Sequence, residues 1–284
     1  MKRVIALGFF DGVHLGHRAL LRKARQEADR LGCMACAVTF DRHPADVIFG
    51  RTTPLLQTLP QREQLMKTLG MDEVLTLPFD ENMMHMPWQE FAAMLRQRHH
   101  AAAVVCGYDF TFGFRGEGNA QRLQEVFGEC CHVIGAVEVS GQRVSSSAIR
   151  AFLQQGQVAL ANRMLGSCHT IEGKVIPGKQ LGRRLGIPTA NIRLPEGTVV
   201  PAFGVYAARV DGHLAVTNIG TRPSVDDGEH ITVESWLLNF EGDLYGKTIC
   251  VELLEFLRPE QKFSSVEELK AQILRDAEQV KQTC

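Results

Sequence analysis

Short apolar runs alternate with amphipathic segments over the first half of the chain. Residues 4–7 form an apolar run that Gly8 closes, and residues 17–31 repeat apolar side chains at helical spacing. The alternation continues with a strand at 36–40, a helix at 62–69, a strand at 73–77, a helix at 88–98 and an apolar strand at 101–106. This order of strands and helices predicts a parallel sheet with helices on both faces, which is a doubly wound α/β domain.

Beyond about Gly166 the segments become short, β-branched and aromatic, with Gly, Pro, Asn and Asp between them. Strands are predicted at 170–175, 205–210, 214–218, 231–238 and 247–256, which favours an antiparallel meander or barrel. An amphipathic helix at 266–280 ends the chain, with Ser264 or Ser265 available as its cap. We place the boundary so that the two domains are residues 1–156 and 157–284.

The composition is that of a globular protein and disfavours several classes of partner. The chain has 284 residues, more than one compact core usually holds, with 45% hydrophobic and 22% charged residues. Its net charge of -1 argues against a nucleic-acid partner. The apolar run at 4–7 is too short for a signal peptide or a membrane span. We therefore expect a cytoplasmic protein with no membrane partner, and no protein partner can be inferred beyond possible self-association.

The eight cysteines are scattered without the regular spacing of a disulfide framework, which favours reduced thiols in the cytoplasm. Cys33 and Cys36 form a C-x-x-C pair. Because no second pair follows at zinc-ribbon spacing, we expect neither a metal nor a redox role for it.

The turn after the first apolar run is the first candidate for chemistry. Gly8, Gly12 and Gly16 let the backbone bend closely around a ligand, and His14 and His17 lie three residues apart where a helix begins. A helix N-terminus favours a phosphate, and two imidazoles there can bind the α- and β-phosphates of a nucleotide more strongly as pyrophosphate leaves. The alternative is a pair of surface histidines beside a structural turn.

This turn resembles the signature of the H-x-G-H nucleotidyltransferases. Their second signature, a Ser-rich turn before a helix with an arginine, is matched at residues 144–150. The resemblance implies that the outer phosphates of ATP are bound by the hydroxyls and guanidinium of Ser145, Ser146, Ser147 and Arg150. Without the resemblance, this segment would be a capping turn.

Two further segments, residues 39–44 and 106–113, narrow the resemblance to the family of bacterial bifunctional riboflavin kinase/FMN adenylyltransferases. The resemblance implies flavin-nucleotide binding by His43, Asp109 and Phe112, with a strand-end turn and core aromatics as the alternatives. In the same way it implies an ATP-binding turn that contains Gly8, Phe10, Asp11, Gly12 and Gly16. Phe9 stands where the family usually has Asn, and Arg42 where it usually has Pro.

The second half is similar to the kinase module of the same family. Residues 173–191 form a glycine-spaced loop that ends in Pro-Thr-Ala-Asn; alone it would be a flexible basic loop. The resemblance implies phosphate binding by this loop, through Gly178, Gly182, Gly186, Thr189 and Asn191. Thr189 and Asn191 would also bind Mg²⁺ through oxygen atoms. Glu234 would be the base toward the ribityl hydroxyl of the flavin, although a strand glutamate is more often an exposed pairing residue.

The resemblance therefore implies a Rossmann-like nucleotidyltransferase domain followed by a Greek-key β-barrel kinase domain with a C-terminal helix. The barrel domain would phosphorylate riboflavin to FMN, and the first domain would convert FMN to FAD and pyrophosphate, each with ATP and Mg²⁺. His14, His17 and Glu234 are the expected catalytic residues. Three alternatives stay open, namely a kinase with a regulatory or binding first domain, a fragment of a class I aminoacyl-tRNA synthetase, and a non-catalytic sensor of flavins or nucleotides.

Overall fold

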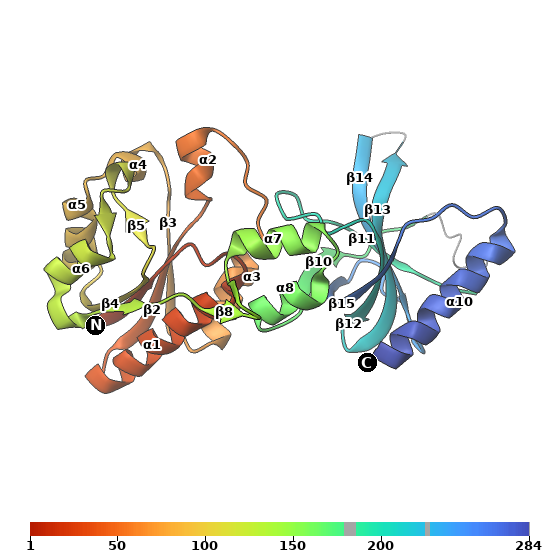
Figure 1. Cartoon of the computed structure of the whole chain (residues 1–284), viewed down its shortest axis with the longest axis horizontal. Helices are drawn as coiled ribbons and strands as arrows, with labels where there is room; N and C mark the ends of the chain where they lie inside the picture. The colour runs from red at the N-terminus through yellow and green to blue at the C-terminus, as the bar shows by residue number, and fades with distance from the viewer. Residues whose placement is uncertain (179–185, 225–227, 284) are drawn as a thin grey trace. The chain divides into compact units, whose positions relative to one another are not determined.

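The chain folds as two compact units, Met1–Ser146 and Ser147–Cys284. The computed structural model describes residues 1–178, 186–224 and 228–283, and it describes no side chains within 222–230. Figure 1 shows the parallel sheet of the first unit and the antiparallel strands of the second.

The first unit is built on a five-stranded sheet whose strands all pair in parallel, in the order β3-β2-β1-β4-β7. The strands are β1 (Arg3–Leu7), β2 (Met34–Phe40), β3 (Glu73–Leu77), β4 (Ala101–Gly107) and β7 (Cys131–Ile134). The order runs outward from β1 in one direction and from β4 in the other, so the topological switch point lies between them. In sheets of this kind ligands bind at the carboxyl ends of the strands at the switch point.

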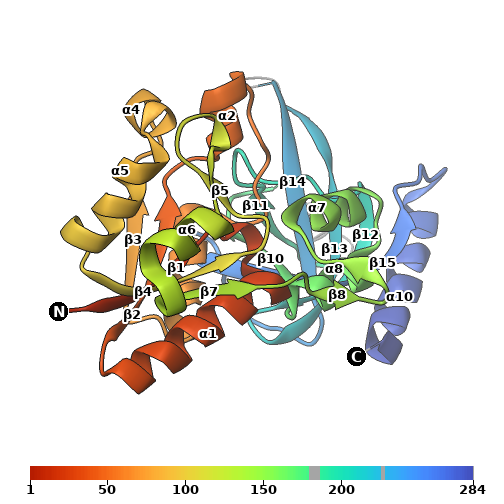
Figure 2. The ribbon, with the colours of Figure 1, turned by 60° about the vertical axis from the view of Figure 1, so that its left-hand side comes forward.

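Helices cover both faces of this sheet because successive residues of each strand point to opposite sides. Val4 and Ala6 pack against the apolar side of α1 (Leu15–Leu31) and against Met66 of α3 (Leu59–Thr68). Ile5 and Leu7 share the opposite core with α5 (Trp88–Ala93), the π-helical turn η2 (Met94–Arg98) and α6 (Ala120–Phe127). Figure 2 shows the sheet between α1 and α6. The doubly wound α/β domain is thereby confirmed.

Short elements complete the first unit. Two short helices are α2 (Pro44–Phe49) and α4 (Glu81–His85), and tight helical turns are η1 (Asp11–Val13), η3 (Phe114–Gly116) and η4 (Gly128–Cys130). Two small antiparallel pairs join β5 (Thr111–Phe112) to β6 (Gly118–Asn119) and β8 (Glu138–Val139) to β9 (Gln142–Arg143). The second of these pairs precedes the Ser-rich turn.

The second unit is a nearly closed antiparallel barrel with the strand order β10-β15-β12-β13-β14-β11. Its strands are β10 (His169–Lys174), β11 (Ala190–Arg193), β12 (Gly204–Val210), β13 (His213–Ser224), β14 (Gly228–Leu237) and β15 (Thr248–Pro259). The neighbours β15-β12-β13-β14 have the order of a Greek key. A bridge between Ile176 and Asn191 brings the two ends of the ladder together.

Three helices among the described residues belong wholly or mainly to the second unit. Ala277 and Val280 of α10 (Val266–Thr283) pack on the barrel beside Val205 and Val216. The other two helices are α7 (Ser146–Gln154) and α8 (Val158–Leu165). Asn162 of α8 is tied to the barrel, since its Nδ2 donates to Leu253 O at 2.8 Å. The predicted barrel and C-terminal helix are therefore confirmed.

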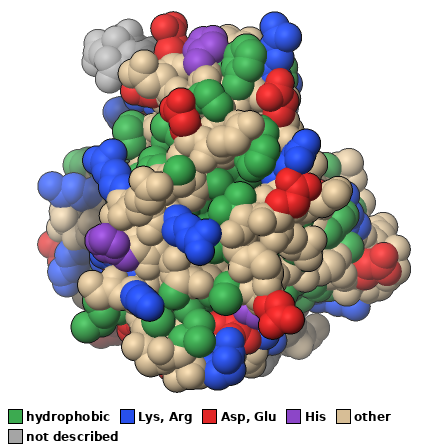
Figure 3. Space-filling model, turned by 90° about the vertical axis from the view of Figure 1, so that its left-hand side faces the viewer, with side chains coloured by type: hydrophobic (Ala, Val, Ile, Leu, Met, Phe, Trp, Pro, Cys, Tyr) green, Lys and Arg blue, Asp and Glu red, His purple; other side chains and the backbone are tan. Residues whose placement is uncertain are grey.

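The surface of the described residues carries mixed charge. Basic and acidic side chains are interspersed on the face of the first unit that Figure 3 shows. Among the described residues, no helix combines the length and apolar character that crossing a membrane would require.

Candidate functional sites

The turn that follows β1 lies at the switch point of the first sheet and has an unusual backbone. Phe10 and Val13 have φ values of 59° and 38°, a left-handed region that non-glycine residues rarely adopt. A Cβ on Gly8 would meet the buried Phe10 ring at 3.1 Å, so this close approach favours glycine. Asp11 is buried, and its Oδ1 accepts a hydrogen bond from Leu56 N at 2.8 Å. The surrounding structure therefore holds the turn in a strained path.

His14 and His17 come together where α1 begins. Their rings are stacked, with centroids 3.6 Å apart and an angle of 12° between the planes. His14 caps the helix, because its Nδ1 accepts the His17 backbone N–H at 3.3 Å. That bond leaves the proton of a neutral His14 on Nε2, where it can be donated to a ligand. A Cβ on Gly16 would meet the His14 ring at 3.2 Å.

Both imidazoles are neutral at physiological pH. Burial lowers the pKa of His14 to about 4, although its own backbone and Asp109 act in the opposite direction. Burial, His14 and then Arg62 lower the pKa of His17 well below its usual value. The histidine pair therefore offers ring N–H donors rather than positive charge to a phosphate.

Phe9 fills the space between two polar groups instead of leaving a gap in the turn. Its ring lies 4.7 Å from the His43 ring in an edge-on arrangement, and the Arg62 guanidinium carbon lies 4.2 Å from its centroid. His43 caps α2, since its Nδ1 accepts the Ala45 N–H at 3.1 Å. Arg42 lies at the surface, with Nη2 3.6 Å from the Asp41 carboxylate.

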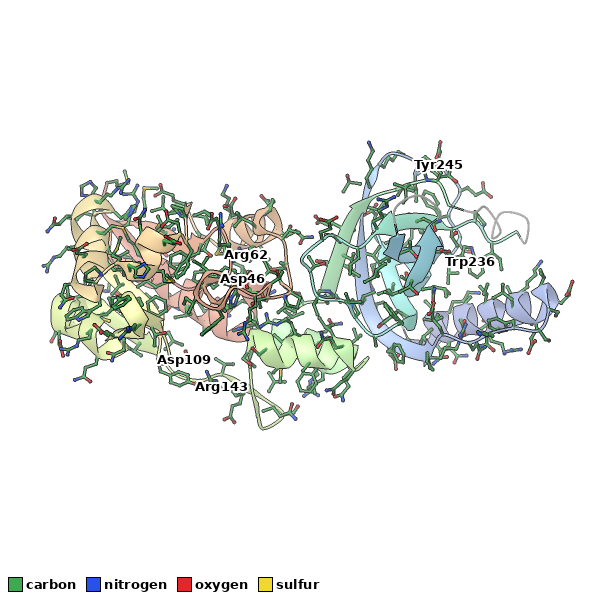
Figure 4. All side chains as sticks on the ribbon, turned by 90° about the horizontal axis from the view of Figure 1, so that it is seen from above. Asp46, Arg62, Asp109, Arg143, Trp236 and Tyr245 are labelled. Carbon is green, nitrogen blue, oxygen red and sulfur yellow. The ribbon has the colours of Figure 1, made fainter. Side chains whose placement is uncertain are left out.

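Asp109 follows the carboxyl end of β4, across the switch point from the histidines. It pairs with Arg143, whose guanidinium carbon also lies 5.0 Å above the Tyr108 ring (Figure 4). Phe112 is 7% exposed and packs against Phe91, with ring centroids 5.0 Å apart. Asp109 is thus an exposed group near the site, whereas Phe112 is mainly part of the core.

The Ser-rich turn spans the end of the first unit and the start of the second. Ser146 Oγ donates to Asp11 O at 2.9 Å, which joins this serine to the turn after β1. Ser145 also lies in the first unit. Ser147 and Arg150 belong to the second unit, where Arg150 Nη2 donates to Ser147 Oγ at 3.2 Å.

Two cavities lined by described residues of the second unit have one lining residue in common, Thr189. The larger, of about 560 Å³, is lined by Gly178, Asn191, Glu241, Asp243 and Tyr245 among others. The smaller, of about 290 Å³, contains Asn218, Glu234 and Trp236 together with several apolar side chains. Figure 4 labels Trp236 and Tyr245, one from each cavity.

Asn191 has an oxygen available for a ligand. Its side chain is 4% exposed, and Nδ2 donates to Thr189 O and Thr189 Oγ1, each at 3.3 Å. Its Oδ1 is buried and has no hydrogen-bond partner among the described groups. A Cβ on Gly178 would lie 2.7 Å from Nδ2 of Asn191, so a side chain there would crowd the amide. Gly186 is exposed with φ 75°, and Gly182 lies outside the described residues.

The register of the barrel strands places Glu234 beside Asn191. Glu234 on β14 is the direct cross-strand partner of Asn191 on β11 and of Asn218 on β13. Because directly opposed residues of antiparallel strands point to the same face, the three side chains form one polar row. The row connects the amide of the larger cavity to the carboxylate of the smaller one.

The wall of the smaller cavity contains a buried ion pair that sequence reasoning missed. Arg258 Nε and Nη2 bind both oxygens of Asp276, the shortest contact being 2.7 Å. Asp276 is 2% exposed and lies on α10. The sequence does contain a signal for it, because Asp276 lies at the helical spacing of the apolar residues Ile273 and Val280. Arg143, directly before the Ser-rich turn, was also missed.

Comparison with known proteins gives matches in both halves. Residues 1–148 match the family model described as FAD synthetase, and residues 165–284 match the one described as riboflavin kinase. The chain is 34% identical to the bifunctional riboflavin kinase/FMN adenylyltransferase of Listeria monocytogenes, over 97% of this chain and 90% of that protein.

Two further matches also span nearly the whole length. The Escherichia coli K12 protein with the same description is 37% identical, over 96% of this chain and 90% of its own. A crystal structure described as a macrolide-efflux protein from Streptococcus pneumoniae has a TM-score of 0.89 and 29% identity, and the match covers 99% of this chain and 94% of that chain.

Proposed function

Because the chain belongs to the family of bifunctional riboflavin kinase/FMN adenylyltransferases, we propose that residues 1–156 adenylylate FMN and residues 157–284 phosphorylate riboflavin. Its substrates are riboflavin, FMN and ATP, and the product of the second step is FAD. Thr189 supports the assignment of the kinase half most directly, because it lines both cavities. A nucleotide in the larger cavity and a flavin in the smaller one would meet at this residue.

In the kinase step, Glu234 is the proposed base. The 5′-hydroxyl of riboflavin attacks the γ-phosphorus of ATP, the bond from that phosphorus to the β-bridging oxygen breaks, and ADP leaves. A carboxylate within reach of the hydroxyl accepts its proton as the new P–O bond forms. The apolar walls around Glu234 suit the ring system of a flavin, and Trp236 is the aromatic member of this lining.

Thr189 and Asn191 fit a bound Mg²⁺. The buried Oδ1 of Asn191 lacks a hydrogen-bond partner among the residues that the structure describes, and a hydroxyl and an amide oxygen are hard ligands of the kind that Mg²⁺ prefers. When bound, Mg²⁺ supplies charge neutralisation at the phosphates. Gly178 leaves room for phosphates beside Asn191, which supports a phosphate-binding role for this segment. We extend that role to Gly182, Gly186 and Thr189.

In the adenylyl step, His14 and His17 are the proposed catalytic residues. An oxygen of the FMN phosphate attacks the α-phosphorus of ATP, the bond between that phosphorus and the α,β-bridging oxygen breaks, and pyrophosphate leaves. Neutral imidazoles donate hydrogen bonds that strengthen as charge builds on the leaving group, and no proton needs to be transferred.

The residues around the histidines have supporting roles in this proposal. Gly8, Phe10, Asp11, Gly12 and Gly16 shape the turn for ATP. Ser145, Ser146, Ser147 and Arg150 bind its outer phosphates, where a bound Mg²⁺ would neutralise part of their charge. The flavin nucleotide is held by His43, Asp109 and Phe112. We also propose a cytoplasmic location, since Cys33 and Cys36 are free thiols.

The test is to incubate the purified protein with riboflavin, ATP and Mg²⁺ and to separate the flavins by chromatography. The parent should form FMN and then FAD. His14→Ala should stop at FMN, because only the adenylyl step loses a hydrogen-bond donor. FAD formation by His14→Ala at the parental rate would contradict the role given to the histidine.

A further inference from the structure

Arg62 is a fully buried cation beside the turn that carries the two histidines. It lies on α3 and is 0% exposed, and Figure 4 shows it inside the first unit. Its Nη1 donates to Phe9 O and, at 3.4 Å, to Thr39 Oγ1. Its Nη2 donates to Phe40 O at 3.3 Å. One side chain thus joins the carboxyl ends of β1 and β2.

The groups that receive these hydrogen bonds are neutral. They are two backbone carbonyls and one hydroxyl, and the face of the Phe9 ring is the fourth neighbour. Arg62 Nε is buried and has no hydrogen-bond partner among the described groups. Burying a guanidinium on neutral partners is costly, and such charges are found where their field is used.

The neighbours of Arg62 indicate where its charge acts. Phe9 O directly precedes Phe10, the first left-handed residue of the turn, so the guanidinium binds the backbone where the strained path begins. The charge also acts on His17 and helps to keep that ring neutral. Asp11 and Glu63 are the acids that act on Arg62 itself.

We propose that Arg62 is a positioning residue for adenylyl transfer, which holds the turn at residues 8–17 in its left-handed path and gives this phosphate site a permanent positive charge. The proposal rests on the adenylyl-transfer role proposed above for His14 and His17. The charge stabilises the pyrophosphate as it leaves, and the forked donors hold the backbone at Phe9 and Phe40 from which the turn with the histidines begins. A fixed cation that is already desolvated needs no reorganisation during the reaction.

The decisive variant is Arg62→Met, which keeps an unbranched side chain of similar reach and removes the charge and the donors. We expect the kcat for conversion of FMN to FAD to fall about 10- to 100-fold, as for loss of one preorganised donor. The KM for FMN should change little, and riboflavin phosphorylation should stay at the parental rate. Arg62→Lys keeps the charge without the fork and should fall between the parent and Arg62→Met.

A second measurement separates positioning from simple structural support. In Arg62→Met the pKa of His17, followed by NMR of the ring protons, should rise because a neighbouring positive charge is gone. In Arg62→Lys it should stay near the parental value. The control is Lys67→Met, which removes an exposed positive charge from the same helix and should alter neither kcat nor the histidine titration.

Two results with Arg62→Met would overturn the proposal. One is a parental kcat, and the other is a loss of activity in proportion to the unfolded fraction while the pKa of His17 stays unchanged. If Arg62→Met does not fold, a parental kcat in Arg62→Lys would overturn the proposal instead. His14→Ala is measured in parallel: FAD formation by that variant refutes the role of the histidines, whereas its loss beside an active Arg62→Met refutes only the role of Arg62.

Discussion

The stability of the first unit should depend on pH through His14. This histidine is 7% exposed and its pKa is about 4 in the folded protein, against about 6.5 in an unfolded chain. The unfolded chain therefore takes up a proton as the pH falls through 6.5, while the folded chain stays neutral until about pH 4. Stability is lost over this window. The linkage relation gives a loss of about 2 kcal/mol between pH 7 and pH 5 from this group alone.

The test compares the parent with His14→Asn. Asparagine keeps an acceptor for the helix cap and cannot take up a proton in this range. The chain has two tryptophans, Trp88 in the first unit and Trp236 in the second, so in a Trp236→Phe background the fluorescence reports the first unit. Urea unfolding at pH 7 and at pH 5 then gives the free energy of unfolding of each protein.

We expect the parent to lose about 2 kcal/mol more than His14→Asn between the two pH values. Other titrating groups are shared by both proteins, and the pKa of His17 is lowered mainly by its burial, which both proteins retain. An equal loss in the two proteins would refute the reasoning, since it would mean that His14 takes up its proton at the same pH in the folded and unfolded chain.

Three other predictions concern single residues. Glu234→Gln should abolish conversion of riboflavin to FMN and leave conversion of FMN to FAD unchanged; chromatography with each flavin as substrate checks this, and retained kinase activity would refute the role of the base. Asn191→Leu should raise the Mg²⁺ concentration for half-maximal kinase activity by about 10-fold or more; an unchanged requirement would exclude this amide as a ligand. Hydrogen bonds from Lys23 and Arg30 lower the pKa of Glu27 to about 2. The contribution of Glu27 to the free energy of unfolding is therefore fully present above about pH 4.5 and is lost as the pH falls toward 2. The partners are 33% and 62% exposed, so solvent weakens both ion pairs, and Glu27→Gln should lower the free energy of unfolding at pH 7 by about 1–2 kcal/mol. Urea denaturation measures this against Glu278→Gln, which removes an exposed glutamate. Equal effects of the two substitutions would contradict the prediction.

Much of the fold could be predicted from the sequence because its long elements have clear periodicity. The strands β1, β2 and β4 are mostly apolar, and α1 has a regular apolar face. Short elements gave weaker signals. β11 has four residues, as does β7, too few for an alternation to stand out.

The candidate sites were predictable where a motif carries the chemistry, and not where tertiary packing does. Glycine spacing and the histidine pair identify the turn after β1. Arg62 lies in the polar run Gln61-Arg62-Glu63-Gln64, and nothing in this local pattern marks it as the buried member. The place of Thr189 in two cavities depends on strand order in the barrel, which no local pattern contains.

Because Asn191 pairs with Glu234 in the β-ladder, the hydrogen bonds between β11 and β14 fix the distance between the proposed metal ligand and the proposed base. The connection that leaves β11, residues 194–203, can gain or lose residues without altering that spacing. A one-residue insertion within β11 or β14 would instead turn one of the two side chains to the opposite face of the barrel. Libraries that seek new flavin or nucleotide preferences should therefore keep the lengths of these two strands constant.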